Sequence, residues 1–90
     1  MSTSLNLVAL NDQPETVAAR VKRLQAEARA LARDHVAALT LQLSEIQAMA
    51  AEIAEGGDAY PPGVRDLARR FVEDIEARVQ TLEAITARTL

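Results

Sequence analysis

The sequence predicts an all-α fold, an antiparallel helical hairpin with a long first helix and a shorter second helix, which pairs into a dimeric four-helix bundle. Apolar residues recur every three or four positions through two long segments, the spacing of an amphipathic helix. All three glycines and two of the three prolines fall between Gly56 and Gly63, where one helix must end and another begin. The composition has no tryptophan, one phenylalanine and one tyrosine, and is dominated by strong helix formers.

The first helix is expected over about residues 13–55. Asn11 or Asp12 is a good N-cap, and Pro14 suits the first turn, where its missing N–H costs nothing. The apolar positions average close to the 3.6-residue helical period, and they are Val17, Val21, Leu24, Ala28, Leu31, His35, Leu39, Leu43, Ile46, Ala50 and Ile53. Residues 1–11 lack this period, and we expect them to form a flexible or docking N-terminal tail.

The glycines and prolines predict a turn over residues 56–61. Gly56 suits the left-handed position that ends a helix, and Pro61 and Pro62 pre-set the backbone for a second helix over about residues 62–88. Its apolar stripe has helical spacing and consists of Val64, Leu67, Ala68, Phe71, Ile75, Val79, Leu82 and Ile85. The short connection favours an antiparallel return, so residues 12–90 form a single helical-hairpin domain.

The distribution of charge favours the same fold-back. No lysine or arginine occurs between Arg33 and Arg65, so the end of the first helix is acidic and the start of the second is basic. We expect ion pairs across the hairpin, each worth less than about 1 kcal/mol when exposed. Their members would come from Glu45, Glu52 and Glu55 on one side and Arg65, Arg69 and Arg70 on the other.

The unequal helix lengths predict a homodimer. A shorter second helix leaves the start of the long apolar stripe uncovered, and a lone hairpin gives each helix a single contact face. Pairing of two hairpins resolves both problems, and the alternatives are a higher oligomer and a complex with an unidentified protein partner. The expected interface comprises Val17, Val21, Leu24, Ala28, Leu31, Leu39, Leu43, Ile46, Ile53, Phe71, Ile75, Val79 and Leu82.

The sequence lacks the residues and motifs that several classes of functional site require. The absence of cysteine removes disulfides, thiolate metal sites and thiol nucleophiles. There is no Glu-x-x-His pair and no phosphate-binding glycine loop, so we expect no catalytic residue, no metal and no cofactor, and hence no enzyme. No signal peptide and no uninterrupted apolar run of about 18 residues is present, which predicts a cytoplasmic protein with no membrane contact.

The expected function is therefore protein–protein interaction, as an adaptor, regulator or assembly component of unspecified role. The alternative is a nucleic-acid-binding regulator that uses the basic half of the first helix. Lys22, Arg29 and Arg33 share one face there and could meet a phosphate backbone. The net charge of −3 provides no overall basic field for such binding.

A weaker alternative is histidine phosphotransfer through His35, the only histidine, which lies on the apolar stripe. The expected architecture resembles the dimerisation domain of two-component histidine kinases, a dimer of hairpins with a phospho-accepting histidine on a helix. The local motif differs from that family, because the acidic neighbour Asp34 precedes the histidine and the stretch HVAALTL that begins at His35 contains no proline. The resemblance thus covers the architecture and not the motif.

Overall fold

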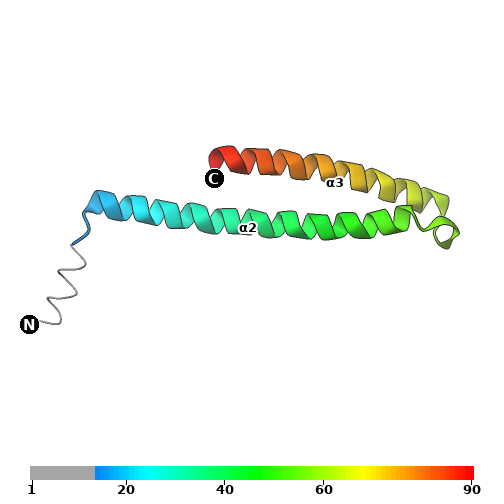
Figure 1. Cartoon of the computed structure of the whole chain (residues 1–90), viewed down its shortest axis with the longest axis horizontal. Helices are drawn as coiled ribbons and strands as arrows, with labels where there is room; N and C mark the ends of the chain where they lie inside the picture. The colour runs from blue at the N-terminus through cyan, green and yellow to red at the C-terminus, as the bar shows by residue number, and fades with distance from the viewer. Residues whose placement is uncertain (1–13) are drawn as a thin grey trace, which may run out of the picture. The chain divides into compact units, whose positions relative to one another are not determined.

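The computed structural model describes residues 14–90 and contains two long helices joined by a short turn (Figure 1). Helix α2 spans Val17–Ala54 (38 residues), the 3₁₀ helix η1 spans Gly57–Ala59, and α3 spans Pro62–Thr89 (28 residues). The chain divides into two compact units, one ending at Ala30 and one comprising Leu31–Leu90. The N-terminal tail and the N-cap candidates Asn11 and Asp12 lie outside the described residues.

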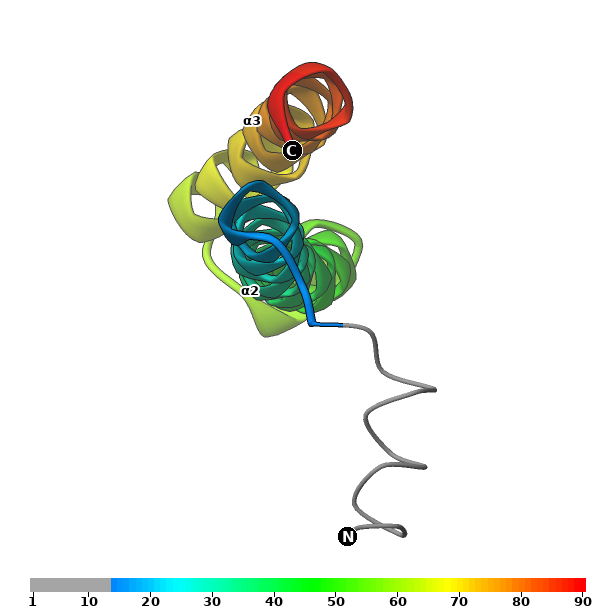
Figure 2. The same cartoon turned by 90° about the vertical axis from the view of Figure 1, so that its left-hand side faces the viewer.

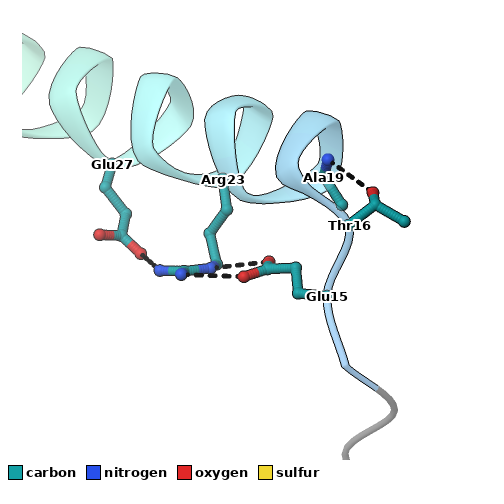
Figure 3. A network of polar contacts seen from close by, with 5 residues as sticks. All are labelled: Glu15, Thr16, Ala19, Arg23 and Glu27. Atoms are coloured by element: carbon teal, nitrogen blue, oxygen red, sulfur yellow. Dashed lines mark hydrogen bonds and ion pairs between the residues drawn. The ribbon is translucent and has the colours of Figure 1, made fainter.

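Helix α2 begins at Val17, later than the expected residue 13, because Thr16 provides its cap. The hydroxyl oxygen of Thr16 accepts a hydrogen bond from the backbone N–H of Ala19 at 3.0 Å (Figure 3). This bond satisfies one of the N–H groups that a helix start leaves without a partner. Pro14 and Glu15 consequently precede the helix and do not belong to its first turn.

Within Leu31–Leu90, α3 returns antiparallel beside α2, as the sequence predicts. The two ribbons lie side by side in both views (Figures 1 and 2). Their contact is centred on three buried alanines, Ala50 and Ala54 of α2 and Ala68 of α3, with Ile53 and Val72 packed beside them. Alanine methyl groups let the two backbones approach closely, but they bury little apolar surface. Residues 14–90 contain no strand, so the all-α hairpin is confirmed.

The side of α3 that faces α2 follows a regular spacing. Its buried and half-buried positions recur every three or four residues, so that they lie on one side of the helix. They are Arg65, Ala68, Val72, Ile75, Val79, Leu82, Thr86 and Leu90. Together with the residues of α2 that they contact, these positions form the seam between the two helices. The seam buries the middle of the apolar stripe of α3, and the neighbouring apolar positions lie outside it.

Two polar side chains, Gln47 and Arg69, connect the helices and fix their register through three hydrogen bonds. The side-chain amide of Gln47 donates to the backbone carbonyl of Val72 at 3.1 Å and to the carboxylate of Glu76 at 3.2 Å. Nearer the turn, the guanidinium of Arg69 donates to the carbonyl of Ala54, one of the carbonyls that the end of α2 leaves free, at 3.3 Å. Gln47 and Arg69 lie on the same edge of the hairpin.

The ion pairs expected across the hairpin do not form in the described part of the chain. The pairs there that belong to the hairpin lie within α3, between Arg69 and Asp66 at 3.1 Å and between Arg78 and Asp74 at 3.0 Å. Helical geometry explains the difference. Glu52 follows the buried Ala50 by two positions, so it lies on the side of α2 that is turned away from α3.

The turn corrects the role expected for Gly56. The left-handed residue is Gly57, with φ of +61°, whereas Gly56 has an ordinary φ of −78°. Gly56 is required for a different reason, since a Cβ atom there would collide with the aromatic ring of Tyr60. Tyr60 itself is extended, and Pro61 follows it as the N-cap of α3 with φ of −60°.

Candidate functional site

The most distinctive surface of the hairpin is an apolar face beside the turn. We call it the tip face and define it by Ile46, Met49 and Ile53 of α2 together with Val64, Leu67 and Phe71 of α3. These six side chains surround a shallow hollow of about 210 Å³ whose floor includes Ala50 and Ala68. The i, i+3, i+4 and i+7 spacings along each helix bring them onto one side, and the antiparallel return brings the two rows together.

The tip face is exposed although it is made of large apolar side chains. Met49 retains 63 %, Leu67 51 % and Phe71 49 % of their full accessible surface, and Ile46 and Val64 are similarly exposed. Large apolar side chains that stand singly on a surface are ordinary, whereas large contiguous groups are typical of contact sites. No polar or charged side chain lines the hollow. Its chemistry suits an apolar partner surface.

The opposite edge of the hairpin has a different character. There the gap between the helices is bridged by the polar side chains Gln47, Arg69 and Glu76, through the hydrogen bonds described above. Arg65 also lies in the seam, and its Nε–H is buried without a hydrogen-bond partner. The hairpin is thus amphipathic as a whole, with one polar edge and one apolar face.

The structure separates the expected interface residues into three groups. Those of the first unit are exposed, with Val17 retaining 81 % of its surface, and the others are Val21, Leu24 and Ala28. Those in the seam between α2 and α3 are half-buried, namely Leu43, Ile75, Val79 and Leu82. The remainder are Leu31 and Leu39, which are exposed, and Ile46, Ile53 and Phe71 on the tip face, of which Ile53 is half-buried and also packs against the seam alanines. Their role in an interface stays a prediction.

The expected interface does not include Met49, because the expected apolar stripe of the first helix has one residue per turn. Ile46, Ala50 and Ile53 satisfy that narrow stripe, and the adjacent Met49 was passed over. In the structure Ala50 faces α3, while Met49 lies on the tip face. A wider stripe, in which each turn contributes a second flanking position, would include Met49, whereas Val64 and Leu67 already belong to the expected stripe of the second helix and are absent only from the expected interface.

Two further hollows lie farther from the turn. The larger, of about 480 Å³, has a mixed lining that includes Arg33 and Glu83 beside Thr40 and Thr86. Both threonine hydroxyls donate to carbonyls of their own helices, at 3.2 and 2.8 Å, which leaves them no free donor for a ligand. The other, of about 290 Å³, contains Arg78 and Thr81 among apolar side chains. The linings of these two hollows contain no serine, cysteine or histidine.

The basic residues of α2 differ in how they are paired. Arg23 makes a two-bond contact with Glu15, at 3.0 and 3.1 Å, and a third bond with Glu27 at 3.1 Å (Figure 3). The hydrogen bond from Arg23 holds the pKa of the Glu15 carboxyl below its usual value, and the same bond raises the pKa of Arg23. Within residues 14–90, Lys22 and Arg29 make no ion pair.

His35, the candidate phospho-acceptor, is exposed on α2. Its sequence neighbour Asp34 is exposed too, and none of the hydrogen bonds in residues 14–90 involves either side chain. In the same residues, no three histidine, aspartate or glutamate side chains gather closely enough to hold a metal ion. Phosphotransfer at His35 stays a prediction.

Comparison with known proteins identifies no relative of this chain. No protein-family model, no curated protein and no solved structure matches it. A search of the helices in residues 14–90 for a segment that is both long and apolar enough to cross a bilayer finds none.

Proposed function

We propose that this protein is a non-enzymatic interaction protein, an adaptor, regulator or assembly component, that acts by burying its tip face against helices of a protein partner. The single observation that supports the proposal is the tip face itself, a contiguous apolar surface beside the turn. A hairpin supplies two sides of a four-helix bundle, and two further helices would complete it.

The small core of the hairpin supports the same proposal. Among residues 14–90 the fully buried apolar side chains are three alanines, which contribute little hydrophobic stabilisation. Burying the exposed half of each large side chain on the tip face would contribute about 1 kcal/mol. Five such contributions reach the lower end of the roughly 5–15 kcal/mol by which folded domains are stable. Partner binding and folding are therefore energetically linked in this proposal.

The lining of the tip face restricts the chemistry of the partner. Charged ligands and phosphates find no counter-charge there, because every residue around the hollow is apolar. A complementary surface must itself be apolar, uncharged and about two helices wide. The partner surface that fits is the stripe of an amphipathic helix, which packs by inserting side chains between those of the tip face.

Site-specific photo-crosslinking in the native host tests the proposal. A photoreactive phenylalanine analogue would replace Leu67 on the tip face or, as a matched control, Leu41. Leu41 lies nine residues before Ala50, about two and a half helical turns, on the opposite side of α2. We expect protein adducts from position 67 and far fewer from position 41. Equal yields from both positions, or no protein adduct at 67, would refute the proposal.

Nucleic-acid binding is the second candidate function, through Lys22, Arg29 and Arg33. The supporting observation is that none of these three makes an ion pair within residues 14–90, whereas Arg23 is held by two carboxylates. Cations without a partner are free to displace counterions from a phosphate backbone. The test is binding to duplex DNA and to RNA at 50 mM salt, with the variant Arg29→Glu/Arg33→Glu as the comparison. No binding at that salt concentration would remove this candidate.

A further inference from the structure

We infer that the partner of the tip face is a second copy of this chain, docked face to face with both turns at the same end of the bundle. The inference rests on the proposed function and specifies its partner and arrangement. It follows from three features of the hairpin: a face that can meet itself, an area that suits a stable dimer, and a division of charge between the two helices.

The tip face is compatible with its own copy. A two-fold interface brings the same patch from each protomer together, so a charged patch would oppose its own charge. The tip face has no charged member, and an apolar side chain is complementary to another of its kind. Farther along α3 on this side of the hairpin, Asp74 and Arg78 neutralise each other at 3.0 Å.

The area available suits a stable dimer. Two further large side chains exposed by about half lie beyond the tip face at helical spacing, Leu39 seven residues before Ile46 on α2 and Ile85 fourteen residues after Phe71 on α3. Seven such side chains, each with half of a surface on the order of 150–200 Å², would bury roughly 600 Å² per protomer. With their flanking polar groups they approach the ~800 Å² per partner of a standard interface.

Symmetry leaves two ways to join the faces of two hairpins. A two-fold axis parallel to the helices puts both turns at one end, and α2 then lies against α3 of the partner. An axis perpendicular to the helices puts the turns at opposite ends, and α2 lies against α2. In the second arrangement each tip face would meet the other end of the partner's face, where Arg78 and Thr81 interrupt the apolar surface.

The charges favour the arrangement with the turns together. The end of α2 carries Glu45 and Glu52 without a basic residue, and the start of α3 carries Arg70. Within residues 14–90 neither Glu52 nor Arg70 makes an ion pair, and both lie near the turn. Placing α2 against α3 of the partner sets acidic flanks beside basic ones, as at the flanking positions of coiled coils. Placing α2 against α2 would bring acidic flanks together.

Two substitutions of equal exposure test which face is covered. Met49 and Leu41 each retain 63 % of their surface in the hairpin, but only Met49 belongs to the tip face. Met49→Glu should raise the dimer dissociation constant by roughly a hundredfold, whereas Leu41→Glu should leave it within about threefold of the wild type. Light scattering on a gel-filtration column over a hundredfold range of concentration measures both. A monomeric wild type, or equal behaviour of the two variants, would overturn the inference.

A distance measurement tests the arrangement without disturbing the face. The chain has no cysteine, so Ala59→Cys, in the exposed turn, accepts a single spin label. Turns at the same end predict a distance between labels of about 20 Å, set by the spacing of neighbouring helices. Turns at opposite ends predict about 40 Å, because α3 has 28 residues at 1.5 Å each. The longer distance, or no dipolar coupling at all, would contradict the inference.

The crosslinking experiment separates this inference from the function on which it rests. Adducts from position 67 that consist of two copies of the chain support both. Adducts that contain only a different protein would overturn the second-copy inference and leave the proposed interaction function in place. An absence of protein adducts would overturn the function as well.

Discussion

Gln47 of α2 donates a hydrogen bond to the backbone carbonyl of Val72 on α3, 25 residues farther along the chain, at 3.1 Å. The same amide also reaches the carboxylate of Glu76 at 3.2 Å. A half-buried amide with two partners on the other helix favours one axial register over others, because sliding the helices would break both bonds. The seam of alanines beside it has no comparable means of choosing a register.

Removing this amide should therefore destabilise the hairpin. Gln47→Ala should lower the free energy of unfolding by about 1 kcal/mol, the usual net contribution of a hydrogen bond that has been exchanged for water. Gln25→Ala is the matched control, since Gln25 is exposed on the same helix. Urea unfolding followed by circular dichroism at one fixed protein concentration measures both. Equal midpoints for the two variants would show that the amide contributes nothing to the hairpin.

Sequence periodicity was sufficient to predict the helices and the turn, because local propensity and apolar spacing agree over most of the chain. It was not sufficient to predict which of the two adjacent glycines has the left-handed backbone conformation and which lies against the ring of Tyr60. Gly56 and Gly57 are equivalent as residues, and only the position of the Tyr60 ring and the φ of +61° distinguish their roles. Such distinctions depend on tertiary contacts that a one-dimensional pattern does not contain.

The candidate site shows the same limit. The sequence contains every residue of the tip face. That its residues on α2 and on α3 form one exposed face can be recognised only when the residues of the seam are known. Ala50 and Ala68 occupy the seam because their small side chains permit close approach, and the larger Met49 and Leu67 are left beside it. The rotation of each helix about its axis decides which apolar residues are buried between the helices and which remain exposed.

The two glycines at positions 57 and 63 should respond in opposite directions to the same change. Gly57→Ala should cost about 1 kcal/mol, because an L-residue at a φ of +61° brings its Cβ close to a neighbouring carbonyl. Gly63→Ala should stabilise by about 0.5–1 kcal/mol, since Gly63 lies inside α3 and alanine lowers the entropy of the unfolded chain. Apart from its own chain neighbours, a Cβ atom at either position meets nothing within 4 Å, so the local backbone conformation alone decides the sign.

Thermal unfolding of the two glycine variants beside the wild type measures this pair. The melting temperature should fall for Gly57→Ala and rise for Gly63→Ala. A rise at Gly57 would mean that the turn readily adopts a conformation without a left-handed residue.

The alanine seam should reject a larger side chain. Ala68 retains 5 % of its surface and contacts α2, so Ala68→Leu would force the helices apart at a cost of about 1–3 kcal/mol. Ala77→Leu adds the same atoms to an exposed position of α3 and should change stability by less than about 0.5 kcal/mol. Chemical denaturation of the two variants at equal concentration makes the comparison. An unchanged stability for Ala68→Leu would show that the seam is looser than three buried alanines imply.

The start of α2 should weaken in acid because of the contact between Glu15 and Arg23. The hydrogen bond from Arg23 lowers the pKa of Glu15 in the folded chain below the value in the unfolded chain. The contact therefore stabilises the helix start above the unfolded pKa, near 4.5, and the stabilisation is lost as the pH falls through the folded pKa. At neutral pH it is fully present.

A carbon-13 titration of the Glu15 carboxyl checks this prediction directly. Arg23→Gln should move the pKa of Glu15 upward toward its ordinary value, whereas Lys22→Gln, which removes a neighbouring charge that makes no ion pair in the described residues, should leave it nearly unchanged. Equal shifts in the two variants would mean that general charge, and not the two-bond contact at 3.0 and 3.1 Å, lowers the pKa. Because the contact lies at the exposed beginning of α2, added salt should also weaken it and raise the pKa of Glu15. A pKa of Glu15 that does not change with salt would show that the hydrogen bonds, and not the Coulomb attraction, lower it.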